Sequence, residues 1–330
     1  MILFVVSDAG PAKYLAYVIS AFGESKYKCI ASNISAKVLD HFSVKYFIGD
    51  EGVDFNNFNL IVTGSRFEPC IDDKWVSIGL QNNIRTISII EHWSLYRKRF
   101  EVNGKYIYPD MIFVNDYQAK VEAAVDGIPE DKLHIVGNPV LENTQKYEYS
   151  ANDELKWRNS LGIDRERKVI TFISENFRAD FPRNSPEYEG FDEFEVLNDI
   201  YAALCTESVL LIKLHPSEDF NKYDFLTKNL NIIIILETDI NRLIEFSNKL
   251  IGMGSMLLIE ASIIKNNVYS YRPNETIEFI GNKNGMVKKI HSKAELKREL
   301  SNYESEDFSV TNNTFLGSTK NIVNLIKNLL

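Results

Sequence analysis

The feature that most constrains the fold is a repeated alternation of short apolar runs with longer amphipathic stretches. Short runs of mostly β-branched and aromatic residues are typical of strands buried on both faces, and the stretches between them have helical spacing. In residues 1–150 the expected strands are Ile2–Val6, Tyr27–Ala31, Lys45–Ile48, Asn59–Thr63, Thr86–Ile90, Met111–Val114 and His134–Val136. In residues 151–330 they are Val169–Ile173, Val209–Leu214, Ile232–Leu236, Lys249–Ile251 and Val268–Tyr271.

The stretches between these runs predict helices, and strands that alternate with helices form parallel sheets. The expected helices are Lys13–Ala21, Ala36–Phe42, Lys74–Gln81, Tyr117–Asp126, Asp192–Leu204, Ile240–Phe246, Leu257–Ile264 and Thr319–Leu330. A chain of 330 residues favours two domains, and a polar stretch after Pro139 separates the two series. We therefore expect an α/β fold of two doubly wound, Rossmann-like domains facing across a cleft. Their expected bounds are 1–145 and 146–330, and the terminal helix can cross back to the first.

Charge and cysteine content exclude several classes of protein. Lys and Arg number 37 against 46 Asp and Glu, and neither half has the basic excess of a nucleic-acid binder. The three cysteines are far apart, so the sequence predicts no zinc knuckle or redox pair and suits a reducing cytoplasm. The opening run Ile2–Val6 is too short for a signal-peptide core, and no run is long enough to cross a membrane. We expect a cytoplasmic protein with no nucleic-acid partner and no metal.

Ligands of open α/β sheets bind beyond the carboxyl ends of the strands, so the residues that follow each strand are candidates for a site. In the first half, small-residue turns with Asp8 and Gly10, and with Gly64 and Ser65, follow two strands. Such turns can receive an anion or a sugar hydroxyl, or they are tight turns alone. The first lacks the G-x-G-x-x-G fingerprint of dinucleotide binders and the G-K-[ST] of a P-loop.

An acid and an imidazole, Glu91 and His92, directly follow the strand Thr86–Ile90, and a basic cluster with Arg97 and Arg99 comes next. Either Glu91 or His92 could take a proton from a substrate hydroxyl, which makes them the candidate catalytic residues. In the alternative interpretation, Glu91 pairs with one of the arginines and fastens a loop.

In the second half, a glycine-flanked serine turn is the strongest motif. Glycines allow close backbone approach, and a helix start offers free amides to a phosphate. The residues of this turn are Gly252, Gly254, Ser255 and Met256. Glu260 follows on the expected helix, where its carboxylate could accept hydrogen bonds from ribose hydroxyls or occupy an ordinary polar position.

Three further strand-end positions complete the donor-site candidates: Ser174, Lys213 and His215-Pro216. A Lys-x-His-Pro sequence at a strand end favours phosphate or nucleotide contact over a purely structural histidine. The long polar segment Ala179–Gly190 is expected to be a mobile loop near the site.

Together these residues resemble the two-domain GT-B glycosyltransferase superfamily over nearly the full chain. The motifs that carry the resemblance are Pro109-Asp110, Gly127-Ile128-Pro129, Val136-Gly137-Asn138-Pro139, Lys213-Leu214-His215-Pro216, Gly254-Ser255 and Glu260-Ala261. The resemblance implies that the second domain binds a nucleotide sugar and the first an acceptor, without a cofactor or metal. It also implies that His215 and Ser255 contact the donor phosphates, and that Glu260 or the serine turn meets the nucleoside.

Within that superfamily, His215-Pro216 and Ser255 resemble two of the three motifs of bacterial sialyltransferases. Asp50-Glu51-Gly52 matches the third by its letters, although it follows a very early strand. Transferases of glycerol phosphate from a cytidine nucleotide show similar His-Pro and serine turns.

The resulting main hypothesis is a glycosyltransferase of bacterial surface-polysaccharide or glycoconjugate assembly. Its acceptor would be a glycan or a lipid-linked molecule, and a lipid-linked acceptor would bring the enzyme to the inner face of the membrane. Its acceptor-binding candidates are Asp8, Gly10, Gly64, Ser65, Arg97 and Arg99. The alternatives are a non-hydrolysing sugar-nucleotide 2-epimerase of the same fold, a cytidine-nucleotide-dependent glycerol phosphate transferase, and a non-catalytic nucleotide-sugar-binding subunit. The sugar, the base, the acceptor, the stereochemical outcome and the oligomeric state are left open.

Overall fold

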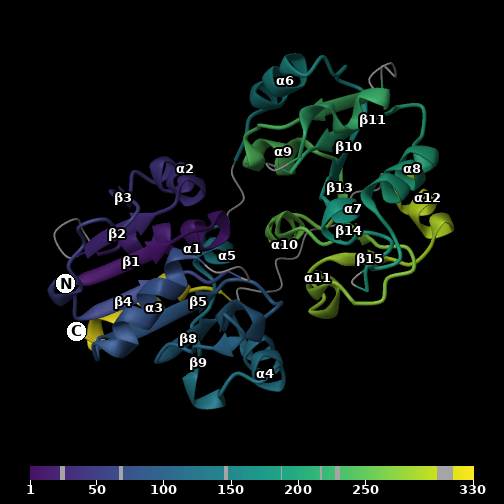
Figure 1. The fold of residues 1–330 in the computed structure, drawn as a ribbon. Coiled ribbons are helices and arrows are strands. Elements are labelled where there is room, and N and C mark those ends of the chain that lie inside the picture. The colour runs from purple at the N-terminus through teal and green to yellow at the C-terminus, as the bar shows by residue number, and fades with distance from the viewer. Residues whose placement is uncertain are drawn as a thin grey trace. The chain divides into compact units, whose positions relative to one another are not determined.

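The structure is a computed structural model that describes residues 1–22, 27–66, 70–144, 148–186, 188–215, 218–226, 231–302 and 315–330. The chain forms two compact units: residues 1–143 together with 312–330, and residues 144–311. Each contains a parallel sheet, so the predicted α/β class is confirmed (Figure 1). No helix in the described ranges is both long and apolar enough to span a membrane.

The first unit is built on a parallel sheet of seven strands in the order β3-β2-β1-β4-β5-β8-β9. These strands are β1 (Ile2–Val6), β2 (Tyr27–Ala31), β3 (Phe47–Ile48), β4 (Leu60–Thr63), β5 (Arg85–Ile90), β8 (Met111–Val114) and β9 (Leu133–Ile135). A small antiparallel hairpin, β6 (Glu101–Val102) and β7 (Lys105–Tyr106), follows a 3-10 helix, Arg97–Phe100. The helices are α1 (Ala9–Ser20), α2 (Asn33–His41), α3 (Ile71–Gln81), α4 (Tyr117–Val125), α5 (Pro139–Asn143) and α13 (Ser318–Asn328).

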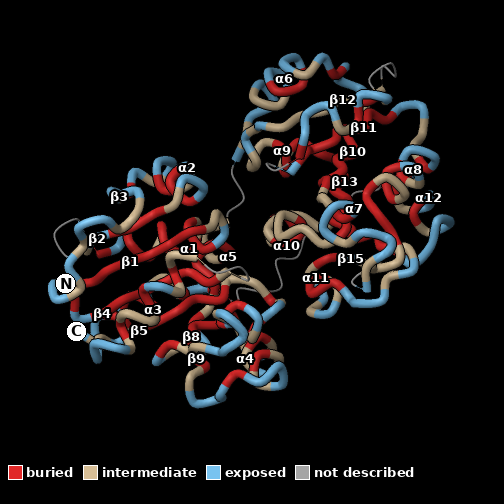
Figure 2. Tube along the Cα trace, viewed as in Figure 1, coloured by how far each residue is buried: buried red, intermediate tan, exposed pale blue. Residues whose placement is uncertain are grey.

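Strand β1 is fully buried because helices cover both of its faces, as the red central strands of Figure 2 show. Phe4 and Val6 belong to a cluster with α1, whereas Leu3 and Val5 pack with Trp75 of α3 on the other side. This two-sided burial explains the unbroken apolar run in the sequence.

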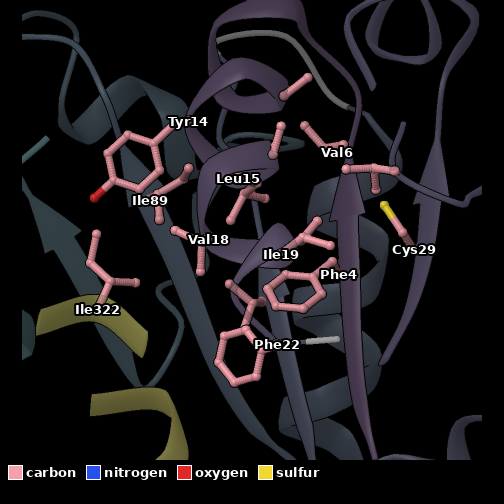
Figure 3. Close-up of a cluster of buried hydrophobic side chains, with 14 of the residues drawn as sticks. Phe4, Val6, Tyr14, Leu15, Val18, Ile19, Phe22, Cys29, Ile89 and Ile322 are labelled. Carbon is pink, nitrogen blue, oxygen red and sulfur yellow. The ribbon is translucent and has the colours of Figure 1, made fainter. Parts of the chain in front are cut away.

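The terminal helix α13 completes the core of the first unit. Ile322, Val323 and Ile326 are buried in the same cluster as Phe4 and Tyr14, and Figure 3 shows Ile322 beside the α1 side chains. The last helix of the chain thus packs with the first, although the whole second unit lies between them in sequence.

The second unit is built on a parallel sheet of six strands in the order β12-β11-β10-β13-β14-β15. The strands are β10 (Lys168–Ile173), β11 (Ser208–Lys213), β12 (Ile232–Ile235), β13 (Lys249–Gly252), β14 (Val268–Tyr271) and β15 (Lys288–Ile290). The helices are α6 (Ala151–Ser160), α7 (Phe177–Asp180), α8 (Glu193–Ala203), α9 (Ile240–Phe246), α10 (Met256–Ser262), α11 (Ile280–Lys283) and α12 (Lys293–Ser301). A 3-10 helix spans Phe220–Leu226.

In this sheet β10 is central, because β11 and β13 pair with it on either side. The loops that leave the carboxyl ends of β10, β13 and β14 therefore meet at one edge. They carry Glu175, Gly254 and Arg272, which lie together in the structure. This edge holds the strongest sequence motif of the chain.

Candidate functional site

Glu91 occupies the carboxyl edge of the first sheet, directly after β5. Two side-chain amides hold its backbone carbonyl: Asn115 donates at 2.8 Å and Asn138 at 3.4 Å. Asn138 also donates to Asn115 and accepts from the amides of Val140 and Leu141 at the start of α5. The ends of three neighbouring strands are thereby tied together, so the position of Glu91 is fixed by its surroundings.

The side chain of Glu91 is the best-placed acid–base group in the first unit. Burial raises its pKa above the usual range, opposed by the charge of Arg99. Its Oε2 atom is buried and has no hydrogen-bond partner among the described residues. A carboxyl group with a raised pKa and an unused oxygen is suited to exchange a proton with a substrate.

His92 is less suited to that task. Burial, and then the charge of Arg99, lower the pKa of its imidazole to about 4. Its Nδ1 atom lies 2.9 Å from the Ser94 hydroxyl. The ring is therefore neutral at physiological pH and a weak base, which favours Glu91 of the two predicted catalytic residues.

The first turn of helix α1, directly after β1, makes room for Glu91. A Cβ atom placed on Gly10 would lie 2.9 Å from Glu91 Oε1, so a side chain there would collide with the carboxyl group. Asp8 accepts from the Ala9 amide at 2.7 Å and caps α1. These two predicted acceptor residues thus shape the turn beside the carboxylate.

A second carboxyl group lies near the same turn and was not identified from the sequence. Asp72 is 2% exposed, and burial raises its pKa to about 6, opposed by hydrogen bonds from Ser7 and Cys70. A Cβ atom on Gly64 would lie 2.9 Å from Asp72 Oδ1. Ser7 and Cys70 line a pocket of about 550 Å³ at the carboxyl edge of the sheet. An acidic residue in the first turn of α3 was the only sequence signal for Asp72.

The remaining predicted acceptor residues hold the loops of this edge. Arg99 is 7% exposed and donates to the carbonyls of Ser65 and Ser94, both at 3.2 Å. Ser65 is itself buried and donates to the carbonyl of Ile89 at 2.6 Å. Arg97 lies over the ring of Tyr106 at 3.8 Å. In place of the ion pair of the alternative interpretation, Arg99 makes backbone contacts and acts on Glu91 through its charge.

In the second unit, the serine turn after β13 is arranged as the sequence predicts, from strand to turn to helix. Ser255 caps α10, where its hydroxyl accepts from the amide of Leu257 at 3.2 Å. Gly252 is tightly packed, because a Cβ atom there would lie 3.2 Å from the carbonyl oxygen of Ile173. At Gly254 a Cβ atom would meet its neighbours at 3.7–3.9 Å, which is ordinary contact.

The amides of this turn already have an acceptor. Glu175 Oε2 accepts from Gly254 at 2.9 Å and from Met253 at 3.3 Å. Burial raises the pKa of Glu175 to about 7, opposed by the two amides and by Arg272. The sequence places Glu175 at a strand end, but the contact joins residues that are 79 positions apart.

Two predicted donor residues are buried beneath the loops. Ser174 is 1% exposed, and its hydroxyl bonds Glu218 at 2.8 Å and the Tyr223 hydroxyl at 2.7 Å. Lys213 is 7% exposed and donates to the carbonyl of Leu214. Their polar atoms therefore support the loops after β10 and β11.

The other donor candidates lie nearer the surface. His215 is exposed, and its amide donates to Glu218 at 2.6 Å. Met256 and Glu260 are half-buried on α10. Pro216 lies outside the described residues.

Two further expectations can be compared with the structure. The described part of the segment 179–190 is tied to α8, because Arg183 bonds both Asp192 and Glu195. Asp50, of the Asp50-Glu51-Gly52 match, accepts from the indole of Trp75 at 2.9 Å and pairs with Lys74. It is a packing residue of the first unit. Among the described residues, no group of three or more His, Cys, Asp or Glu side chains is arranged to hold a metal.

Comparison with known proteins gives matches in structure alone. No family profile and no curated protein sequence matches the chain. S. aureus MnaA, solved with UDP, is 14% identical with a TM-score of 0.66, covering 100% of this chain and 97% of its own. The UDP-GlcNAc 2-epimerase of Methanocaldococcus jannaschii, in complex with UDP-GlcNAc and UDP, is 13% identical with a TM-score of 0.67 and 99% coverage of both chains.

A third similar structure is HepE of Anabaena in complex with UDP-glucose. It is 10% identical with a TM-score of 0.66, covering 99% of this chain and 100% of its own. The fold is GT-B-like. The similar structures include UDP-GlcNAc 2-epimerases, and at 10–14% identity they show the fold alone.

Proposed function

We propose that the chain is an enzyme that acts on a UDP-sugar and epimerises the sugar at C2. The observation that carries the proposal is Glu91, a carboxyl group with a raised pKa and an unpartnered oxygen at the carboxyl edge of a GT-B-like sheet. The UDP and UDP-sugar complexes of similar folds support the choice of ligand.

The second unit would hold the nucleotide. The loop amides near Gly254, the hydroxyl of Ser255 and the imidazole of His215 are donors suited to phosphate oxygens. Glu260, on α10, would accept from ribose hydroxyls. Ser174 and Lys213 contribute by keeping the loops after β10 and β11 in place.

Epimerisation places a particular demand on the first unit. Inverting C2 requires removal of its proton from one face, while the electron pair of the broken C–H bond forms a C1–C2 double bond and UDP leaves C1. A proton then returns to C2 from the other face as the UDP oxygen bonds to C1 again. Two groups with pKa values near neutrality serve this best. Burial raises the pKa values of both Glu91 and Asp72, and both lie beside the turn after β1.

Glycosyl transfer to a hydroxyl acceptor is the second candidate, and the burial of Asp72 favours it. Asp72 is 2% exposed whereas Glu91 is half-buried, so Glu91 is the carboxyl group with better access to a substrate. Transfer needs one base, which removes the hydroxyl proton as the nucleotide leaves C1. A glycan or lipid-linked acceptor belongs to this second candidate.

Solvent deuterium distinguishes the two reactions. The purified chain is incubated in D₂O with UDP-GlcNAc or UDP-glucose and no acceptor, and the sugar is followed by proton NMR and mass spectrometry. Epimerisation incorporates one deuterium at C2 and produces the C2 epimer. Glu91→Gln should abolish both signals.

Other outcomes identify the alternatives. Release of UDP only when a sugar acceptor is added, with no deuterium at C2, shows a transferase. Preference for CDP-glycerol over UDP-sugars in binding would indicate the glycerol phosphate class. Binding of a UDP-sugar without any turnover, with or without acceptors, would indicate a non-catalytic subunit and contradict both enzyme proposals.

A further inference from the structure

We propose that the carboxylate of Glu175 competes internally with the phosphate of the nucleotide, and that binding of a nucleotide sugar takes up a proton at Glu175. This inference rests on the proposed binding of a nucleoside diphosphate by the second unit. It adds a pH-dependent binding step that the role of Glu91 does not require.

The competition follows from the hydrogen bonds at the serine turn. The backbone amides of Met253 and Gly254 both donate to Glu175 Oε2. A phosphate oxygen near Gly254 would need the same two donors. A Cβ atom on Gly254 would make only ordinary contacts, the nearest at 3.7 Å from Glu175 Oε1, so an added atom fits beside this glycine and a phosphate oxygen can approach there. A carboxylate and a phosphate oxygen cannot both use this amide pair as full acceptors.

The backbone around Glu175 is held, so the carboxyl group stays close to an incoming phosphate. Ser174 is fixed by Glu218 and Tyr223. Lys222 donates to the carbonyl of Glu175 at 3.3 Å and to the side chain of Asn176 at 3.1 Å. The loop is therefore anchored on both sides of Glu175.

Charges from each neighbouring loop act on the Glu175 carboxyl group. Arg272, after β14, stabilises its ionised form, and Glu218, after β11, destabilises it. Arg272 is itself paired with Glu189 and Glu275, which weakens the stabilisation that its charge gives to the ionised form of Glu175. Lys222 pairs with Glu218 and with the buried carboxylate of Glu193. The result is a carboxyl group that is about half ionised near pH 7.

A second negative group beside this carboxyl raises its affinity for a proton further, because like charges disfavour the ionised form. A phosphate that takes the amide pair therefore binds best when Glu175 is protonated. By linkage, binding takes up a fraction of a proton near pH 7, and the affinity falls as the pH rises above 7.

Isothermal titration calorimetry with UDP-GlcNAc tests this inference. A nucleotide sugar is chosen because its phosphates do not change charge between about pH 6 and pH 8.5. Titrations in buffers of different ionisation enthalpy give the number of protons taken up. For the wild type we expect about half a proton at pH 7, and an affinity that falls about ten-fold between pH 7 and pH 8.5.

Two variants define the role of the charge. Glu175→Gln keeps the size and an acceptor for the amides but removes the ionisation, and Glu175→Ala leaves the amides open. Both should show no proton uptake, and Glu175→Gln should bind about ten-fold more tightly than the wild type at pH 8.5. The matched control is Glu207→Gln, an exposed carboxylate of the same unit, which should behave like the wild type. Circular dichroism and melting temperature confirm that each variant is folded.

The outcomes separate this inference from the proposed function. Affinity that is independent of pH in the wild type, or weaker binding in both Glu175 variants, overturns the inference and leaves nucleotide binding standing. Absence of UDP-GlcNAc binding in the wild type and in both variants overturns both. Binding by Glu175→Gln where the wild type binds weakly supports the competition directly.

Discussion

Glu91 and Glu175 occupy comparable places in the two sheets but differ in the hydrogen bonds that their carboxyl groups make. Each follows the carboxyl end of a buried strand, β5 or β10, and burial raises the pKa of each. Glu175 Oε2 accepts from two backbone amides, whereas Glu91 Oε2 has no partner in the part of the chain that the structure describes.

The difference separates two uses of a buried carboxyl group. A carboxyl oxygen without a hydrogen-bond partner in the protein is available to exchange a proton with a bound ligand, which suits Glu91 for acid–base chemistry. An oxygen that accepts two amides is already satisfied, so a ligand at Glu175 must displace it or neutralise it. A raised pKa alone therefore does not identify a catalytic acid, and the hydrogen-bond partners decide its role.

The largest effect is expected at Glu91. Glu91→Gln keeps the shape and removes the acid–base function, so turnover should fall by about 10²–10⁴-fold with little change in affinity for the UDP-sugar. His92→Asn should cost less than ten-fold, because the imidazole is a weak base with a pKa of about 4. Steady-state kinetics and calorimetry of both variants check this. A larger loss of turnover for His92→Asn than for Glu91→Gln would mean that His92, and not Glu91, is the catalytic base.

The next largest effect is expected on nucleotide binding by the second unit. His215→Ala and Ser255→Ala should each weaken binding by about 1–3 kcal/mol, the worth of a hydrogen bond to a charged group. Ser255→Ala also removes the cap of α10, so its melting temperature is measured alongside. Normal binding by both variants would contradict the assignment of the site to this turn.

Gly10, in the first turn of α1, and Gly254, in the turn before α10, should respond differently to the same substitution. Gly10→Ala places a methyl group 2.9 Å from Glu91 Oε1 and should destabilise the first unit by about 1–3 kcal/mol. Gly254→Ala meets only ordinary contacts, so the fold should be unaffected while UDP-sugar binding weakens. Urea unfolding and calorimetry of the two variants measure both quantities. Equal destabilisation by the two substitutions would contradict the predicted difference in packing around Gly10 and Gly254.

The last prediction concerns how stability depends on pH. Because the folded pKa of Glu175 is about 7 and the unfolded value is lower, the folded state holds this proton more tightly. Relative to Glu175→Gln, the wild type should therefore lose stability as the pH rises from about 4.5 to about 7, and no further above that. Hydrogen exchange of β10 and β13 in both proteins at pH 5 and pH 8 measures the difference. A constant difference across this range would mean that the carboxyl group titrates normally.

Much of the fold could be predicted from the sequence because buried parallel strands have a distinctive pattern. The expected strands Ile2–Val6, Met111–Val114 and Val268–Tyr271 agree with β1, β8 and β14 to the residue. The edge strand β15 was not expected, because Lys288 and Lys289 interrupt its apolar pattern. Helix α6 was missed because its face is mostly polar, although Ser150 and Asp153 form a capping box at its start.

The candidate site could be predicted only in outline. The rule that ligands of open α/β sheets bind beyond the carboxyl ends of the strands identified Glu91 and the serine turn as candidates. It could not show that Arg99 and Ser174 point into the protein, since their partners are backbone carbonyls and side chains distant in sequence. Nor could it reveal that Glu175 accepts from the Gly254 amide, because the contact is created by the pairing of β10 with β13.

The packing of α13 against α1 has a consequence for biosynthesis. Ile322, Val323 and Ile326 fill the core of the first unit but are synthesised after residues 144–311. Residues 144–311 emerge earlier and bring their own complete sheet. The second unit can therefore reach its native state before α13 is synthesised, whereas the first, although its synthesis begins earlier, exposes the apolar surface of α1 until α13 is available. Over that interval the first unit is the part of the nascent chain that depends on chaperones.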